Sequence, residues 1–214
     1  MAKESASGGQ TTLKNDTLLY LQGRYDDSFV YEKTEDTGFN PSEHTFCFSS
    51  NLLQGRKVRV RVSETSGGRK YSDNYLALKY EAEIRKLFLE CAEQVFDDVY
   101  IIYTASDAIP YEVIQADASV KNYLKQTDVT QYIFAVVSGE ELQSIDAVRK
   151  MSDMIASVTK NYQLTVVAFE ESSVLQLEEA ELKRRISEGL YVSSGVITNV
   201  KGVLDEHWND GGSR

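Results

Sequence analysis

A row of basic side chains is the clearest candidate for binding chemistry in this sequence. Lys57, Arg59 and Arg61 alternate with three valines, and alternation with a period of two is typical of a β-strand whose faces meet different surroundings. The three cations therefore share one face of a predicted strand, from which they could bind a phosphate, an anionic polymer or an acidic patch of a protein. The alternative is a solvated sheet face on which the cations pair with Asp or Glu of the next strand.

The histidines and cysteines do not form a recognisable reactive pair. His44 precedes Cys47 by three residues in a predicted strand, which puts their side chains on opposite faces. His207 lies near the end of the sequence, and neither cysteine belongs to a CxxC motif, so zinc and redox sites have no support. We expect Cys47 and Cys91 to be buried free thiols, and a disulfide between them is the alternative in an exported protein.

Neighbouring acidic residues raise the alternative of an acid-dependent hydrolase, in which two carboxylates act as general acid and base. Each pair lies at an expected element end or on a solvated helix face, which is typical of surface charge. The glycine-rich phosphate motifs GxGxxG and GxxxxGK[ST] and the serine motif GxSxG do not occur. We therefore expect no catalytic residue, no cofactor and no metal ligand. The acidic pairs are Asp26-Asp27, Asp97-Asp98, Glu140-Glu141, Glu170-Glu171 and Glu178-Glu179.

Composition excludes several classes of protein. The chain has 214 residues, of which 23 are Lys or Arg and 33 are Asp or Glu, for a formal net charge of −10. This balance argues against nucleic acid as a partner, because binding to phosphate depends on cations. Hydrophobic residues make up 42%, while 13 glycines and 2 prolines are too few for a collagen-like or disordered chain. No stretch approaches the roughly 18 apolar residues of a transmembrane helix, so no transmembrane segment is expected.

Hydrophobic periodicity predicts the elements that must position these side chains. The first half reads as a helix, three antiparallel strands, a long helix and a strand, at residues 13–25, 29–33, 45–49, 57–64, 74–96 and 99–104. The second half reads as helix, strand, helix, strand, helix and a final strand or hairpin, at residues 119–126, 131–137, 144–162, 163–170, 177–188 and 190–200. The strand-helix-strand segment of the second half fits a parallel crossover.

This order of elements predicts an α+β fold, with an antiparallel sheet covered by the long helix and followed by a second α/β subdomain. We expect a flexible leader at residues 1–12, a helix-on-sheet subdomain at 13–105 and a second subdomain at 106–214. One continuous domain is the alternative. Residues 206–214 are expected to be a frayed end.

Two segments carry a resemblance to known proteins. They are LLYLQGRYDDSF at residues 18–29 and DNYLALKY at residues 73–80. In these segments and in its element order, the first half resembles cystatin-like and PepSY-like domains and uncharacterised surface lipoproteins of Gram-positive bacteria. The resemblance implies export and a shared shape, in which a helix lies across a curled antiparallel sheet, and it implies no functional residue.

The sequence favours a noncatalytic interaction or binding module of the bacterial cell surface, with Lys57, Arg59 and Arg61 as the candidate residues for an anion or a partner. The small polar residues of positions 1–10 resemble the tether that follows the lipid-bearing cysteine of a bacterial lipoprotein. Such a lipid anchor would lie upstream of the given chain, and the partner would be a protein or a cell-surface polymer. An intracellular, cytoplasmic α+β adaptor and the hydrolase are the alternatives.

Overall fold

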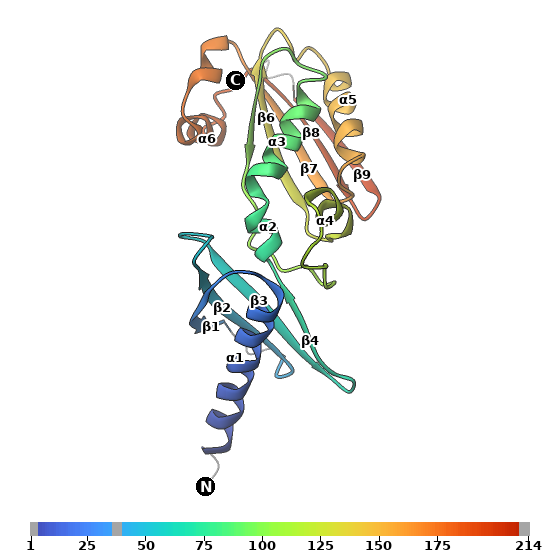
Figure 1. The fold of residues 1–214 in the computed structure, drawn as a ribbon. Helices are drawn as coiled ribbons and strands as arrows, with labels where there is room; N and C mark the ends of the chain where they lie inside the picture. The colour runs from blue at the N-terminus through green and yellow to red at the C-terminus, as the bar shows by residue number, and fades with distance from the viewer. Residues whose placement is uncertain (1–3, 36–39, 210–214) are drawn as a thin grey trace. The chain divides into compact units, whose positions relative to one another are not determined.

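The computed structural model describes residues 4–35 and 40–209, with side chains from residue 11 onward. These residues form helices and two β-sheets, which confirms the predicted α+β class. The chain divides into two units, one formed by Met1–Lys79 with Asp107–Ser119 and the other by Tyr80–Ser106 with Val120–Arg214. Figure 1 shows the first unit mainly in blue and teal and the second in green to red.

The first unit is built on a four-stranded antiparallel sheet with the strand order β1-β2-β3-β4. Val58, Val60 and Val62 of β3 are fully buried, so the predicted alternation is confirmed and the cations of this strand take the other face. The elements of this unit are α1 (Glu4–Arg24), β1 (Phe29–Thr34), β2 (Glu43–Ser50), β3 (Lys57–Thr65), β4 (Gly68–Asp73) and α2 (Tyr75–Lys79).

Two helices pack on this sheet: α1, and α2, which is the first part of the long helix predicted at 74–96 and whose Tyr75 lies edge-on to Phe29 of β1 with ring centroids 5.7 Å apart. Tyr20 of α1 stacks on Tyr71 of β4 with 4.9 Å between ring centroids. The predicted long helix is interrupted at Tyr80, whose backbone torsions (φ −95°, ψ 6°) lie outside the helical range. Its second part, α3 (Glu81–Ala92), belongs to the second unit. The boundary expected at residue 105 therefore lies elsewhere, because apolar periodicity does not say which sheet a helix covers.

Helix α1 also corrects the prediction of a flexible leader at residues 1–12. The helix begins at Glu4, so the expected leader is helical from residue 4, and residues 1–3 lie outside the described residues. Leu13 and Thr17 are buried and anchor the middle of the helix. Once this part of the helix has formed, each further residue toward Glu4 adds one backbone hydrogen bond without the cost of starting a new helix. In the described part of the chain, no helix combines the length and the apolar character needed to cross a membrane.

The second unit is built on a five-stranded sheet with the strand order β5-β6-β7-β8-β9. Strands β6 and β7 are parallel, which confirms the predicted crossover through α5. The final strand or hairpin expected at 190–200 is the strand β8, which forms a hairpin with β9; β9 extends to Asn209, so the frayed end expected at 206–214 is a strand up to that residue, and residues 210–214 lie outside the described residues. The elements are α3, β5 (Val99–Tyr103), α4 (Val120–Gln126), β6 (Gln131–Ser138), α5 (Ile145–Ala156), β7 (Tyr162–Phe169), the 3-10 helix η1 (Ser172–Gln176), α6 (Glu179–Ser187), β8 (Ser193–Val200) and β9 (Val203–Asn209).

Helices cover the two faces of this second sheet unequally. On one face, α3 packs through Phe88, which lies edge-on to Tyr103 of β5 with ring centroids 5.3 Å apart. On the same face, α5 approaches Gly195 of β8 so closely that a Cβ atom there would lie 2.6 Å from Val148. The opposite face carries a cluster in which Leu182 of α6 meets the sheet, and Figure 1 shows α6 on the other side of the sheet from α5.

Candidate binding sites

The predicted basic row lies on β3 with each cation beside a protein partner. The Lys57 ammonium is 3.0 Å from the carboxylate of Glu32 in β1, and the Arg59 guanidinium is 2.8 Å from that of Glu35. Arg61 donates a hydrogen bond of 2.7 Å to the carbonyl oxygen of Pro110. This geometry matches the alternative in which neighbouring acids neutralise the sheet face, and binding of an external anion by the three cations stays a prediction.

A polar pocket of about 400 Å³ opens beside this row. The buried Cys47 thiol lines it, and the Arg59 Nε atom is buried without a hydrogen bond to any described residue. The hydrogen bond from Lys33 lowers the pKa of Glu35 to about 2, with further contributions from Cys47 and Arg59. The pocket is lined by Glu35, Cys47, Gly55, Arg56, Lys57, Arg59 and Asp107.

The two thiols are buried and free, and they lie in different units. Burial raises the pKa of the Cys47 thiol, and the adjacent Glu35 carboxylate raises it further. Burial likewise raises the pKa of the Cys91 thiol. Both groups are therefore protonated near neutrality, which suits packing and not nucleophilic attack. His44 lies in the first unit and His207 in the second, where it contacts Asp205 at 3.1 Å.

The acidic pairs Glu140-Glu141 and Asp97-Asp98 come together, but the contact is between a carboxylate of one pair and the backbone amides of the other. Glu141 accepts hydrogen bonds of 2.8 Å and 3.3 Å from the amides of Asp97 and Asp98. Asp27 of another pair accepts hydrogen bonds from Ser50 and from the Ser28 amide. Burial favours its neutral form, yet these hydrogen bonds outweigh burial and hold the pKa of Asp27 below its ordinary value. Because ionised carboxylates only accept hydrogen bonds, these groups fix local turns by holding nearby donors.

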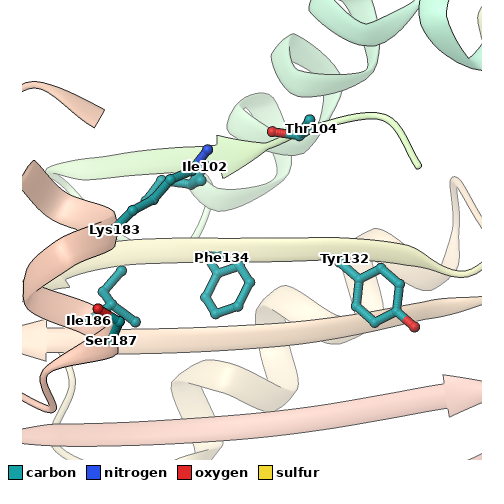
Figure 2. Close-up of a pocket in the computed structure, with 7 residues that line it drawn as sticks. All are labelled: Ile102, Thr104, Tyr132, Phe134, Lys183, Ile186 and Ser187. Carbon is teal, nitrogen blue, oxygen red and sulfur yellow. The ribbon is translucent and has the colours of Figure 1, made fainter. Parts of the chain in front are cut away.

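An apolar groove of about 450 Å³ lies on the partly covered face of the second sheet. Strand register sets its floor, because Ile102 of β5 lies opposite Phe134 of β6 and Tyr132 shares the face of Phe134 at a spacing of two. Helix α6 forms one end, and Figure 2 shows its three side chains there with Thr104 and Tyr132 toward the other end. The lining residues are Ile102, Thr104, Tyr132, Phe134, Lys183, Ile186 and Ser187.

The groove combines an apolar floor with a few polar groups at its rim. Ile102 is 4% exposed, whereas Tyr132 is 52% exposed. Lys183 supplies the one ammonium among the seven lining residues, and it lies 2.7 Å from the carboxylate of Glu179. Small-molecule sites in proteins share this character, with volumes of roughly 300–1,000 Å³ and few polar anchors. The groove can therefore bind an apolar body and hold its polar edge.

Sequence reasoning did not single out any of the groove residues for binding. The signal was present in the strand at 131–137, which is apolar on both faces and so needs cover from both sides. In the structure, α6 supplies cover for the second face through Leu182. No group of three or more metal-ligating side chains occurs within residues 4–35 and 40–209, the part that the structure describes.

No family model and no curated protein matches the chain. Among solved structures, it is similar to a DUF5037 family protein from Ruminococcus gnavus, with 11% identity over 88% of this chain and 92% of that chain, and a TM-score of 0.40. This TM-score is too low for the similarity to indicate a function. The resemblance of the first half to cystatin-like and PepSY-like domains stays a prediction.

Proposed function

We propose that the protein is a noncatalytic binding module whose second unit binds a small amphipathic molecule with a flat apolar body. The observation that supports this function is the groove between α6 and the sheet. Its floor offers Phe134 and Ile102 to an apolar ring, and burial of that ring would provide the main binding free energy. At the rim, the Thr104 hydroxyl can orient the polar edge of the ligand, and the Ser187 hydroxyl, which already donates to the Arg184 carbonyl, can accept a hydrogen bond from it.

The charges around the groove favour binding over acid-base chemistry. The Lys183 ammonium at the groove pairs with the Glu179 carboxylate. The same carboxylate lies 3.0 Å from the guanidinium of Arg85 in α3. Catalysis by a proton donor and acceptor needs a titratable group directed at the reacting atom and tuned near the working pH. A cation shared with a carboxylate instead suits recognition of a weakly anionic edge on the ligand.

Export to the bacterial cell surface is a separate proposal, and it rests on the resemblance of the segments at 18–29 and 73–80 to surface lipoproteins, because α1 begins at Glu4 and a flexible tether at positions 1–10 no longer supports it. The alternative is an intracellular adaptor, which is favoured by the two buried free thiols because cytosolic proteins keep cysteines reduced. Fractionation of the native protein in its source cells would separate the two. Recovery with the membrane, followed by release in detergent, supports export, and recovery in the cytosol overturns it.

Binding to the groove can be tested with anilinonaphthalene sulfonate, an amphipathic aromatic anion whose fluorescence rises in apolar sites. Substitution Ser187→Phe places a ring in the groove. Ser187 donates its hydroxyl to the carbonyl of Arg184 at 2.7 Å. Ser157 offers a matched control, because its hydroxyl makes the same bond to Met154 at 2.6 Å at the end of α5, away from the groove.

We expect saturable binding of the dye to the wild type at one site, binding at least about tenfold weaker to Ser187→Phe, and unchanged binding to Ser157→Phe. Circular dichroism of all three proteins checks that they are folded, because dye also binds to expanded states. Equal affinity for wild type and Ser187→Phe, or no saturable binding at all, would overturn the proposed function.

A further inference from the structure

Strand β9 ends the second sheet and presents an unpaired side. In the part of the chain that the structure describes, β8 is the one strand that pairs with β9. Its side chains are largely exposed, including Val203 at 70% and Leu204 at 57%. A regular edge strand of this kind can accept another strand, because its outward N–H and C=O groups lack partners in the sheet.

The hairpin turn decides which backbone groups of β9 face outward. Lys201 and Gly202 have φ values of 54° and 79°, as in a two-residue type I′ turn. Val200 and Val203 are opposite each other across this turn, so they form a hydrogen-bonded pair, and such pairs alternate along an antiparallel ladder. Asp205 and His207 therefore bond toward β8. Their neighbours Leu204, Glu206 and Trp208 direct their backbone groups outward.

The sequence of β9 is complementary to itself in one antiparallel register. A two-fold axis at Glu206 places Leu204 opposite Trp208 of the second copy, and both positions have outward backbone groups. The same axis places Asp205 opposite His207 of the second copy in non-hydrogen-bonded positions, where side chains approach most closely. The two large apolar residues Leu204 and Trp208 then meet each other, and each Asp205 carboxylate meets a His207 imidazole, while Val203 lies opposite Asn209 and Glu206 opposite Glu206 of the second copy.

Neighbouring registers lose this complementarity. A shift by two residues sets Asp205 against Asp205 of the second copy, or His207 against His207 of the second copy, and like groups directly opposite each other are unfavourable. At the axis itself, Glu206 lies opposite Glu206 of the second copy, and each accepts hydrogen bonds of 2.8 Å and 3.0 Å from Arg149 of α5, which also donates to Asp146 at 2.9 Å. Each Glu206 thus brings its own arginine partner to the axis, which reduces the repulsion between the two carboxylates.

We propose that β9 binds β9 of a second copy of this chain, so that two five-stranded sheets join into one continuous sheet about a two-fold axis at Glu206. The interface is isologous, as in most homodimers. Because a single strand pair buries little surface, we expect dissociation on the order of tens of micromolar. This inference is independent of the proposed function, since the groove residues take no part in it.

A charge-exchange experiment tests the register directly by sedimentation equilibrium of the full chain. His207→Asp places two carboxylates opposite each other twice in the dimer, and Asp205→His places two imidazoles there. The double variant Asp205→His/His207→Asp restores both opposite pairs with the axis unchanged. It also keeps the contact within the strand, where His207 lies 3.1 Å from Asp205.

We expect a concentration-dependent dimer for the wild type and a dissociation constant at least about tenfold higher for each single variant. The double variant should return to within about threefold of the wild type. Thermal midpoints of the monomers, measured at low concentration, show whether the hairpin still folds. A wild type that stays monomeric at several hundred micromolar overturns the proposal, and so do single variants that dimerise as the wild type does.

Discussion

The hydroxyl of Tyr25, at the start of the loop after α1, donates a hydrogen bond of 2.8 Å to Oδ1 of Asp73, at the end of β4. Both residues are buried, and the Tyr20 hydroxyl donates to the other oxygen of Asp73 at 2.7 Å. The Asp73 carboxylate therefore ties the C-terminal half of α1 to the sheet of the first unit. A buried carboxylate requires such donors, because an unpaired charge in the interior is costly.

Removal of the Tyr25 hydroxyl should destabilise the first unit. Tyr25→Phe keeps the ring that stacks on Tyr75 at 4.1 Å but leaves Asp73 with one donor fewer. Hydrogen bonds to charged groups contribute about 2 kcal/mol, so we expect the free energy of unfolding in urea to fall by about that amount. Tyr31→Phe is the control, because its hydroxyl contacts the neutral Thr34 side chain, and we expect a change within about 0.5 kcal/mol. Equal losses for the two variants would contradict the role of Asp73.

The same tyrosines make stability sensitive to alkaline pH. Burial raises the pKa of Tyr20 and Tyr25, and the nearby Asp73 carboxylate raises both further. Burial and Asp27 raise the pKa of Tyr75 in the same way. In the unfolded chain, tyrosine loses its proton near pH 10, so above about that pH the unfolded state binds fewer protons than the folded state. By linkage, stability is fully present below pH 10 and falls as the pH rises further.

Urea unfolding followed by circular dichroism at pH 8, 10 and 11 would measure this loss. We expect a small fall at pH 10, where tyrosine in the unfolded chain is half ionised, and a much larger fall at pH 11. Tyr25→Phe removes one of the three titrating hydroxyl groups, so its slope above pH 10 should be shallower than that of the wild type. A midpoint that stays flat to pH 11 in the wild type would show that these hydroxyl groups ionise as readily in the folded state as in the unfolded chain.

The basic row of β3 can be tested with inorganic polyphosphate as an anionic polymer. If Lys57, Arg59 and Arg61 bind such a ligand beyond their ion pairs, Arg59→Glu/Arg61→Glu should weaken binding at least about tenfold at low salt. Arg184→Glu/Arg185→Glu is the matched control, because it makes the same change in net charge on α6, where both arginines pair with Glu181. Unchanged binding in the β3 variant, or an equal loss in the control, would remove the row as a binding site.

Local patterns were sufficient to predict most elements but not their assignment to sheets. The alternation around Val60 identified β3, and the apolar run at 131–137 identified β6, because strand periodicity is a property of neighbouring residues. The long helix at 74–96 looked continuous because its apolar stripe continues through Tyr80. In the structure, Tyr80 packs against Tyr123 of α4 with ring centroids 6.3 Å apart, a contact between distant parts of the chain that periodicity does not encode.

The candidate sites differ in how far sequence could predict them. The shared face of Arg59 and Lys57 follows from strand geometry, yet their partners Glu35 and Glu32 come from another part of the chain through a register that only the folded sheet defines. The groove depends on how much of the second sheet α6 leaves uncovered, and that follows from tertiary packing. The complementarity of β9 was readable in principle, but residues 206–214 looked like a chain end and not a strand.

The division of the chain has a consequence for any attempt to dissect it. Because Asp107–Ser119 belongs with the first unit and Tyr80–Ser106 with the second, the backbone passes from one unit to the other more than once. A fragment cut at residue 105 would carry β5 and α3 without the strands that flank them and would lack a piece of its own unit. Neither half is thus an uninterrupted stretch of sequence, and a separable version would require the segment at 107–119 to be joined by a new linker.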